Sequence, residues 1–169
     1  MNSFDKSIWR CRYLCRRTKL RVFKALIMPV LLYGSETWTL SSALESRFDA
    51  FCNRSLRRIM GYCWWDHVSN QRLHCETGTG PVTCTIRDRQ LRLYGHLTRF
   101  PQADPAHPVV SVRDNPGRRR PVGRPRKSWL EQIDQTCHEM GRVPAWRLAM
   151  SDPCRYKQRV EAAMRPHRR

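Results

Sequence analysis

The sequence is poor in acidic residues and has no long apolar stretch. Of its 169 residues, 14 are Asp or Glu against 32 Lys or Arg, which gives a formal net charge of +18 at pH 7. The longest apolar run, 25–33, is shorter than the roughly 20 residues that a membrane-spanning helix needs. The first 20 residues contain no apolar segment typical of a secretory signal peptide. We therefore expect a soluble, intracellular chain with a polyanionic partner and no membrane partner.

The eight cysteines include no Cys-x-x-Cys pair, so the tight ligand spacing of a zinc knuckle is missing. Cys11 with Cys15, and Cys63 with His67, leave a zinc site open as an alternative, although such pairs fall on separate expected helices. An intracellular chain keeps its thiols reduced. We therefore expect structural or incidental cysteines, no metal site and no cofactor.

Apolar residues recur at helical spacing, and no segment alternates as a strand does, which predicts an all-α fold. Ser42–Glu45 and Ser128–Glu131 fit capping boxes, in which Ser caps one amide and Glu reaches back to another. Gly34, Gly61 and Gly78 are expected to end helices. The expected helices are 19–32, 42–60, about 69–77, about 83–99, 128–140, and two short ones near Trp146 and after Asp152.

The same periodicity predicts which side chains are buried. Pro29 should kink the first helix because it lacks a backbone donor, and Lys19, Arg21 and Lys24 should face outward. The residues expected in the core are Leu20, Phe23, Ile27, Val30, Leu31, Leu44, Phe48, Phe51, Cys52, Leu56, Ile59, Ile86, Leu91, Leu93, Tyr94, Leu97, Trp129, Ile133, Cys137, Met140, Tyr156 and Val160.

Residues 101–127 differ from the rest, because they contain six of the eleven prolines and almost no apolar periodicity. This composition is typical of an extended linker. We expect a basic N-terminal segment (1–18), a helical bundle (19–100), a basic Pro/Arg-rich linker (101–127) and a small C-terminal helical unit (128–165).

The strongest candidate for contact with nucleic acid is the linker sequence GRRRPVGRPRKSW, 117–129, because clustered cations bind phosphates by charge. Gly123–Pro125 also resembles an AT-hook core, whose Arg enters a narrow A·T minor groove. A solvated linker and a nuclear-localisation signal are the alternatives. The candidate residues are Arg118, Arg119, Arg120, Arg124, Arg126 and Lys127 in the linker and, on helix faces, Arg54, Arg57, Arg58, Arg89 and Arg92.

Two weaker patterns have simpler interpretations. The helices on either side of Gly78 have the outline of a helix-turn-helix, but most short helical hairpins are packing units. His96 could act as a base, but no nucleophile is placed beside it in the sequence. We expect a packed or hydrogen-bonded histidine and no catalytic residue.

Four sequence blocks occur in a fixed order. They are TKLRVFKALIMPVLLYGSETWTL (18–40), SLRRIMGYCWWDHVSNQRLHCETG (55–78), RQLRLYGHLTRF (89–100) and GRPRKSWLEQID (123–134). Together they resemble the C-terminal end of non-LTR, LINE-class retrotransposon polyproteins of the RTE-like kind. In those proteins a thumb and a basic tail follow the catalytic palm of the reverse transcriptase. The resemblance covers about residues 15–160.

The resemblance implies a thumb-like bundle that holds RNA and/or DNA and takes no small-molecule substrate. Leu31, Leu32, Tyr33 and Trp38 would pack there against neighbouring helices. The segment DPCRYKQRV departs from the family pattern at Tyr156, where a Trp is usual.

A reverse transcriptase holds two divalent ions, Mg²⁺ in the parent family, on aspartates of an aromatic-x-Asp-Asp turn. This chain has no Asp-Asp dipeptide. We therefore expect a nuclear, nucleic-acid-binding fragment that starts downstream of the palm and catalyses nothing by itself. The alternatives are a non-functional retroelement-derived product and a DNA-binding, AT-hook-like interaction protein.

Overall fold

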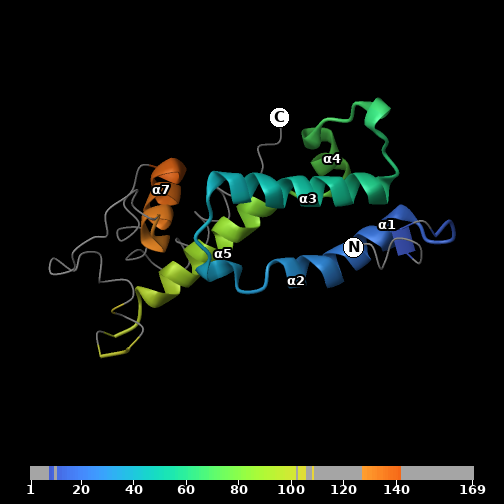
Figure 1. Ribbon diagram of the computed structural model, residues 1–169. Helices are drawn as coiled ribbons and strands as arrows, with labels where there is room; N and C mark the ends of the chain where they lie inside the picture. Colours follow the sequence, from blue (N-terminus) through green and yellow to red (C-terminus); the bar gives the residue numbers. More distant parts are fainter. Residues whose placement is uncertain (1–7, 10, 102, 106–107, 109–126, 142–169) are drawn as a thin grey trace. The chain divides into compact units, whose positions relative to one another are not determined.

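The computed structural model describes residues 8–9, 11–101, 103–105, 108 and 127–141. Every regular element within these ranges is helical, which confirms the predicted all-α class. None of the helices described is both long and apolar enough to cross a lipid bilayer. The elements are α1 (Arg16–Val22), a π-helical turn (Phe23–Ile27), α2 (Met28–Leu31), a 3-10 turn (Ser35–Thr37), α3 (Ser42–Met60), a 3-10 turn (Trp64–Asp66), α4 (Asn70–Thr77), α5 (Val82–Leu97) and α7 (Trp129–Gly141) (Figure 1).

The chain forms two compact units. The first consists of the described residues up to Tyr33 together with Ser42–Thr83, and it contains α1 to α4 and the first two residues of α5. The second consists of Gly34–Ser41 together with the described residues from Cys84 onward, and it contains the rest of α5 and α7. The expected helices near Trp146 and after Asp152 lie outside the described residues.

The predicted helix 19–32 starts earlier and is not uniformly α-helical. Its middle is a π-helical turn, in which the amide of Met28 donates to the carbonyl of Phe23, five residues back. Pro29 follows in the first turn of α2. A proline cannot supply the usual donor to the preceding turn, and the longer π-type hydrogen bonding lies immediately before it.

Three predictions for this segment are wrong. Lys19 is buried. Its ammonium group donates to the carbonyl of Trp9 (2.7 Å), so the charge is satisfied while the aliphatic part of the side chain is covered. Val30 is 78% exposed and Tyr33 is 85% exposed, so neither packs against a neighbouring helix. Phe23 and Leu32 supply the buried apolar surface instead.

The long helix α3 packs against α1 and α4 within the first unit. Its buried stripe is Cys52, Leu56 and Ile59, which are four and three residues apart and so share one face. Leu44 and Phe51, both expected in the core, are exposed, because the face that meets the neighbouring helices is centred on the other three residues. The helix begins at Ser42 itself. The predicted capping box had placed Ser42 at the N-cap, one residue before the first turn.

The junction between α4 and α5 is held from elsewhere in the first unit. Ser69 caps α4 through its hydroxyl, and Gly78 ends the helix at a φ of 57°, as predicted. Lys24 donates from its ammonium group to the carbonyls of Thr77 (3.3 Å) and Gly78 (3.1 Å). A cation at this end of a helix also suits the helix dipole.

The first turn of α5 is capped by Asp49 from the middle of α3. One carboxylate oxygen accepts from the backbone amides of Val82 (2.9 Å) and Thr83 (3.2 Å), and the other accepts from the Thr83 hydroxyl (2.8 Å). These amides have no partner within their own helix. Asp49, which is 33 residues before Val82 in the sequence, therefore replaces a local N-cap residue of α5.

In the second unit, α5 and α7 hold the non-helical segment Gly34–Ser41 through its backbone. Gln90 donates to the carbonyl of Trp38 (2.8 Å), the indole of Trp129 donates to the carbonyl of Glu36 (2.8 Å), and the amide of Leu40 donates to Gln132 (2.9 Å). The core around these bonds consists of Leu40, Ile86, Leu91, Tyr94, Ile133 and Cys137.

The predicted capping box at the start of α7 is confirmed. The amide of Glu131 donates to the Ser128 hydroxyl (3.2 Å), and the amide of Ser128 donates to the Glu131 carboxylate (3.1 Å). Ile133 and Cys137 are buried as predicted, and Trp129 is half-buried with its ring 6.3 Å from that of Tyr94.

Replacement of Asp49 by Ala should lower the free energy of unfolding by about 1–2 kcal/mol, because three donors at the start of α5 lose their acceptor. Asp49→Asn is the matched variant, since it keeps one acceptor oxygen and should cost less. Urea unfolding followed by far-ultraviolet circular dichroism measures both. Equal stability of Asp49→Ala and the parent would show that water replaces the cap without loss.

Candidate nucleic-acid interface

An open groove of about 780 Å³ lies at the C-terminal end of α3 and the loop that follows it, all within the first unit. We call it the arginine groove. The side chains that matter for its chemistry are Arg54, Arg57, Arg58, Tyr62, Trp64 and His67. No Asp or Glu is among the residues that line it, so its lining carries positive charge only.

The end of α3 places the arginines on the groove. Gly61 adopts a φ of 77°, the amide of Tyr62 donates to the carbonyl of Arg57 (2.9 Å), and the amide of Gly61 donates to that of Arg58 (3.3 Å). This pair of bonds is a Schellman motif, which turns the chain sharply at the helix end. Arg54 lies three and four residues before the other two arginines, so all three share one side of the helix.

The loop after α3 is held in one conformation by short-range bonds. The amide of Cys63 donates to the Asp66 carboxylate (2.7 Å), and the amide of Asp66 donates to the carbonyl of Cys63 (3.2 Å). His67 adopts a φ of 46°, which a residue with a side chain rarely does. Such strain persists only where surrounding contacts enforce it.

Arg57 supplies one of those contacts. Its guanidinium donates to the carbonyl of Val68 (3.0 Å) and to the side-chain oxygen of Asn70 (2.6 Å), and the side chain is half-buried. Arg57 therefore holds the loop against α3. The side chains of Arg54 and Arg58 are exposed at the same groove.

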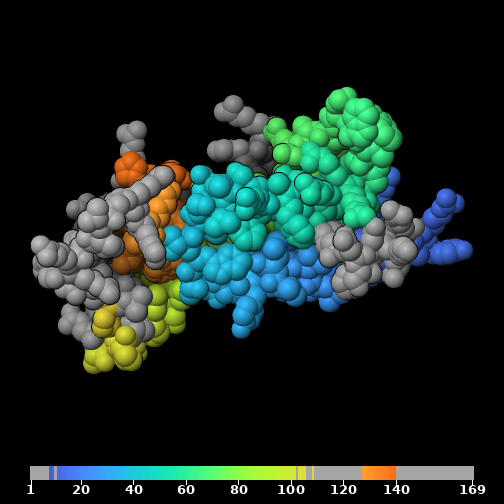
Figure 2. All heavy atoms as spheres, viewed as in Figure 1, coloured from blue at the N-terminus to red at the C-terminus, as the bar shows by residue number. Residues whose placement is uncertain are grey.

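The loop displays two large aromatic side chains to solvent. Trp64 is 81% exposed and Trp65 is 60% exposed, and their rings meet edge to face with centroids 5.6 Å apart. The loop belongs to the green part of the surface in Figure 2. Of the two, only Trp64 lines the arginine groove.

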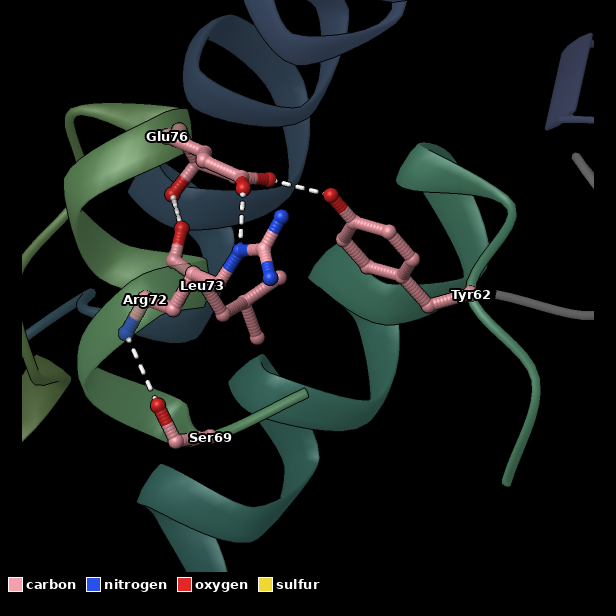
Figure 3. Close-up of polar contacts among 6 residues, drawn as sticks. Tyr62, Ser69, Arg72, Leu73 and Glu76 are labelled. Carbon is pink, nitrogen blue, oxygen red and sulfur yellow. Dashed lines mark hydrogen bonds and ion pairs between the residues drawn. The ribbon is translucent and has the colours of Figure 1, made fainter. Parts of the chain in front are cut away.

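A polar cluster joins the end of α3 to α4 (Figure 3). The Tyr62 hydroxyl donates to the Glu76 carboxylate, which also accepts from the Arg72 guanidinium (2.9 Å). These two bonds, chiefly the one from Tyr62, lower the pKa of Glu76, and the same bond raises the pKa of Tyr62. The cluster anchors the Tyr62 ring at one side of the groove.

The structure groups some of the predicted site residues and not others. Arg54, Arg57 and Arg58 line one groove. Arg89 is half-buried on α5 in the second unit, where Arg92 pairs with Asp88 (2.9 Å). Lys127 is exposed, and the remaining linker candidates, Arg118, Arg119, Arg120, Arg124 and Arg126, lie outside the described residues together with the AT-hook-like Gly123–Pro125.

The helix-turn-helix alternative finds little support at the start of α5. A recognition helix offers its first turn to base edges. Here the amides of Val82 and Thr83 bind Asp49, and the Val82 side chain is completely buried. His96 is exposed, and its ring meets that of Phe100 edge to face at 4.7 Å, which is a packing contact.

The cysteines described form no disulfide, and no group of three or more His, Cys, Asp or Glu side chains suited to a metal ion lies within the described ranges. Burial raises the pKa of Cys52 to about 12, and nearby Asp49 adds to this effect. Hydrogen bonding to Thr18 lowers the pKa of the exposed Cys15.

Tyr62, Trp64 and Asn70 line the groove but were not predicted as site residues, and His67 was considered only as a possible zinc ligand. The available signal was a pair of adjacent tryptophans directly after a basic helix that ends at glycine. Adjacent large aromatic side chains in a short loop cannot both be buried easily, and this points to a surface role.

The Tyr62–Glu76 bond should make stability depend on pH at both ends of the scale. Since the pKa of Glu76 is lowered by folding, its contribution is present above about pH 4.3 and is lost as the pH falls through the folded pKa. Since the pKa of Tyr62 is raised, the contribution is present below about pH 10 and is lost as the pH rises through its folded pKa.

We therefore expect the stability difference between the parent and Glu76→Gln to be largest near neutral pH and to shrink at both extremes. Tyr62→Phe is the matched variant, since it keeps the ring and removes the donor. Chemical denaturation at a series of pH values measures the difference. A difference that does not vary with pH would contradict the contact.

Known proteins give no assignment for this site. No family model matches the sequence, and no curated protein or solved structure matches the chain.

Proposed function

We propose that this chain binds nucleic acid and performs no chemistry by itself, in the manner of the thumb and C-terminal region of a non-LTR retrotransposon reverse transcriptase. In that role it holds template and primer, and its location is nuclear. The observation that carries the proposal is the arginine groove, where exposed Arg54 and Arg58 lie beside Trp64 with no acidic residue in the lining.

Charge, the donor geometry of Arg and the exposed aromatic surface together favour a nucleic acid over other polyanions. A chain with +18 net charge attracts phosphates at long range, and each phosphate neutralised by Arg or Lys releases counterions. Arg presents a planar fork of donors that fits phosphate oxygens. An exposed aromatic side chain beside such cations adds a surface on which bases can stack.

Within the second unit, sequence blocks that carry the resemblance lie in contact with one another. Three of the four sequence blocks meet there: Trp38 from the first, Gln90 and Tyr94 from the third, and Trp129 from the fourth. The basic linker, Arg118–Lys127, supplies further phosphate contacts in this proposal.

Arg54→Gln combined with Arg58→Gln should weaken binding of both single and double strands. It should also reduce the slope of log affinity against log salt by roughly 1.4–1.8, since each lost phosphate contact removes about 0.7–0.9. The matched control is Arg21→Gln combined with Arg47→Gln, which removes the same charge from exposed sites of the first unit that do not line the groove. Fluorescence anisotropy across a salt series measures both quantities.

Equal losses in the two double variants would mean that only total charge matters. No measurable binding by the parent at low salt would refute nucleic-acid binding altogether. Circular dichroism of each variant checks that the fold is kept.

The absence of chemistry is tested separately. Purified chain with template, primer, nucleotides and Mg²⁺ should extend the primer no more than a blank reaction does. The reason is the lack of paired aspartates able to hold two metal ions. Template-dependent synthesis that co-purifies with the chain through several steps would overturn this part of the proposal.

A further inference from the structure

We infer that the arginine groove takes a single-stranded polynucleotide, with one unpaired base stacked on the indole of Trp64 and the adjoining phosphates held by Arg54 and Arg58. The inference rests on the proposed function and deepens it, because charge alone does not specify the form of the strand. It also assigns separate tasks to the side chains of the groove.

The exposure of Trp64 is the first argument. Tryptophan is highly buried on average in folded proteins, yet four fifths of this side chain is open to solvent. With so little of its surface covered, a broad face of the indole is available to a ligand. Among the common occupants of cationic grooves, nucleobases offer a flat apolar face of matching size.

The fixed conformation of the loop is the second argument. The reciprocal bonds between Cys63 and Asp66, together with the bonds from Arg57 to Val68 and Asn70, hold the turn that carries Trp64. A platform that is already ordered loses little conformational entropy on binding. The strained backbone of His67 within this turn shows that these contacts, and not local preference, determine its shape.

The combination of charge and aromatic surface distinguishes strand forms. In a duplex the faces of the bases are stacked on one another, so an indole cannot reach them without unstacking a step. A single strand exposes base faces and phosphates together, which suits a groove that has cations and one aromatic platform. An acidic peptide would use the arginines but gain little from the indole.

The test uses the full chain, a labelled oligothymidylate and a blunt duplex of mixed sequence at one salt concentration. Trp64→Leu keeps an apolar side chain but removes the aromatic face, and it should weaken binding of the single strand about tenfold, within the range for a stacked base. Binding of the duplex should change less than about twofold. Trp64→Phe should retain part of the single-strand affinity, because a smaller aromatic face remains.

Trp65→Leu is the matched control, since Trp65 is the neighbouring exposed tryptophan but does not line the groove. It should leave both affinities within about twofold of the parent. A second readout is indole fluorescence: oligothymidylate should quench the parent more than it quenches Trp64→Phe, because a stacked base is in contact with the Trp64 ring.

Each result separates the inference from the function on which it rests. If the parent binds neither oligonucleotide, the proposed function fails. If the parent binds both and Trp64→Leu binds the single strand as tightly, the function stands and the stacking site is refuted. If Trp64→Leu weakens binding of the single strand and of the duplex equally, the site is also refuted. The same holds if binding of polyglutamate, measured as a further polyanion, depends equally on Trp64.

Discussion

The excess of cations over anions is the constraint on which the rest of this structure depends. With so few carboxylates, several cations donate to backbone carbonyls instead. Lys19 donates to the carbonyl of Trp9, Lys24 to carbonyls at the end of α4, and Arg57 to the carbonyl of Val68. Each of these bonds joins residues at least 10 positions apart in the sequence, so the cations act as structural links. The side chains of Arg54 and Arg58 are exposed at the groove, where an external anion can reach them.

The same constraint gives the few carboxylates large structural roles. Asp49 satisfies three donors at the start of α5, and Glu76 joins Tyr62 to Arg72. Both carboxylates belong to the first unit and lie on helices that flank the groove loop. Neither carboxylate lines the groove.

In the second unit, neutral side chains bind the backbone that links the helices. The segment Gly34–Ser41 is neither α-helical nor paired in a sheet, so its backbone groups need partners from side chains. Gln90, Trp129 and Gln132 provide them. This explains why the apolar helix is followed by the polar and aromatic segment GSETWTL. The backbone of this segment is hydrogen-bonded to side chains of α5 and α7.

Local signals in the sequence determined the helices, because caps and glycine stops depend on bonds between residues at most five apart. The Ser128–Glu131 box and the stops at Gly61 and Gly78 form as expected. The grouping of Arg54, Arg57 and Arg58 on one helix side follows from the same short-range geometry. For the site, the sequence therefore located the helical arginines but could not rank them.

Only the tertiary structure decided which arginine is structural and which side chains face solvent. Arg57 is engaged because Val68 and Asn70 return to α3, and no periodicity in the sequence predicts that return. Lys19 is buried, and Val30 and Tyr33 are exposed, for the same kind of reason: burial depends on which segments pack together, and helical spacing defines a face without defining its neighbours. The exposure of Trp64 likewise depends on a loop that is held against α3 by Arg57.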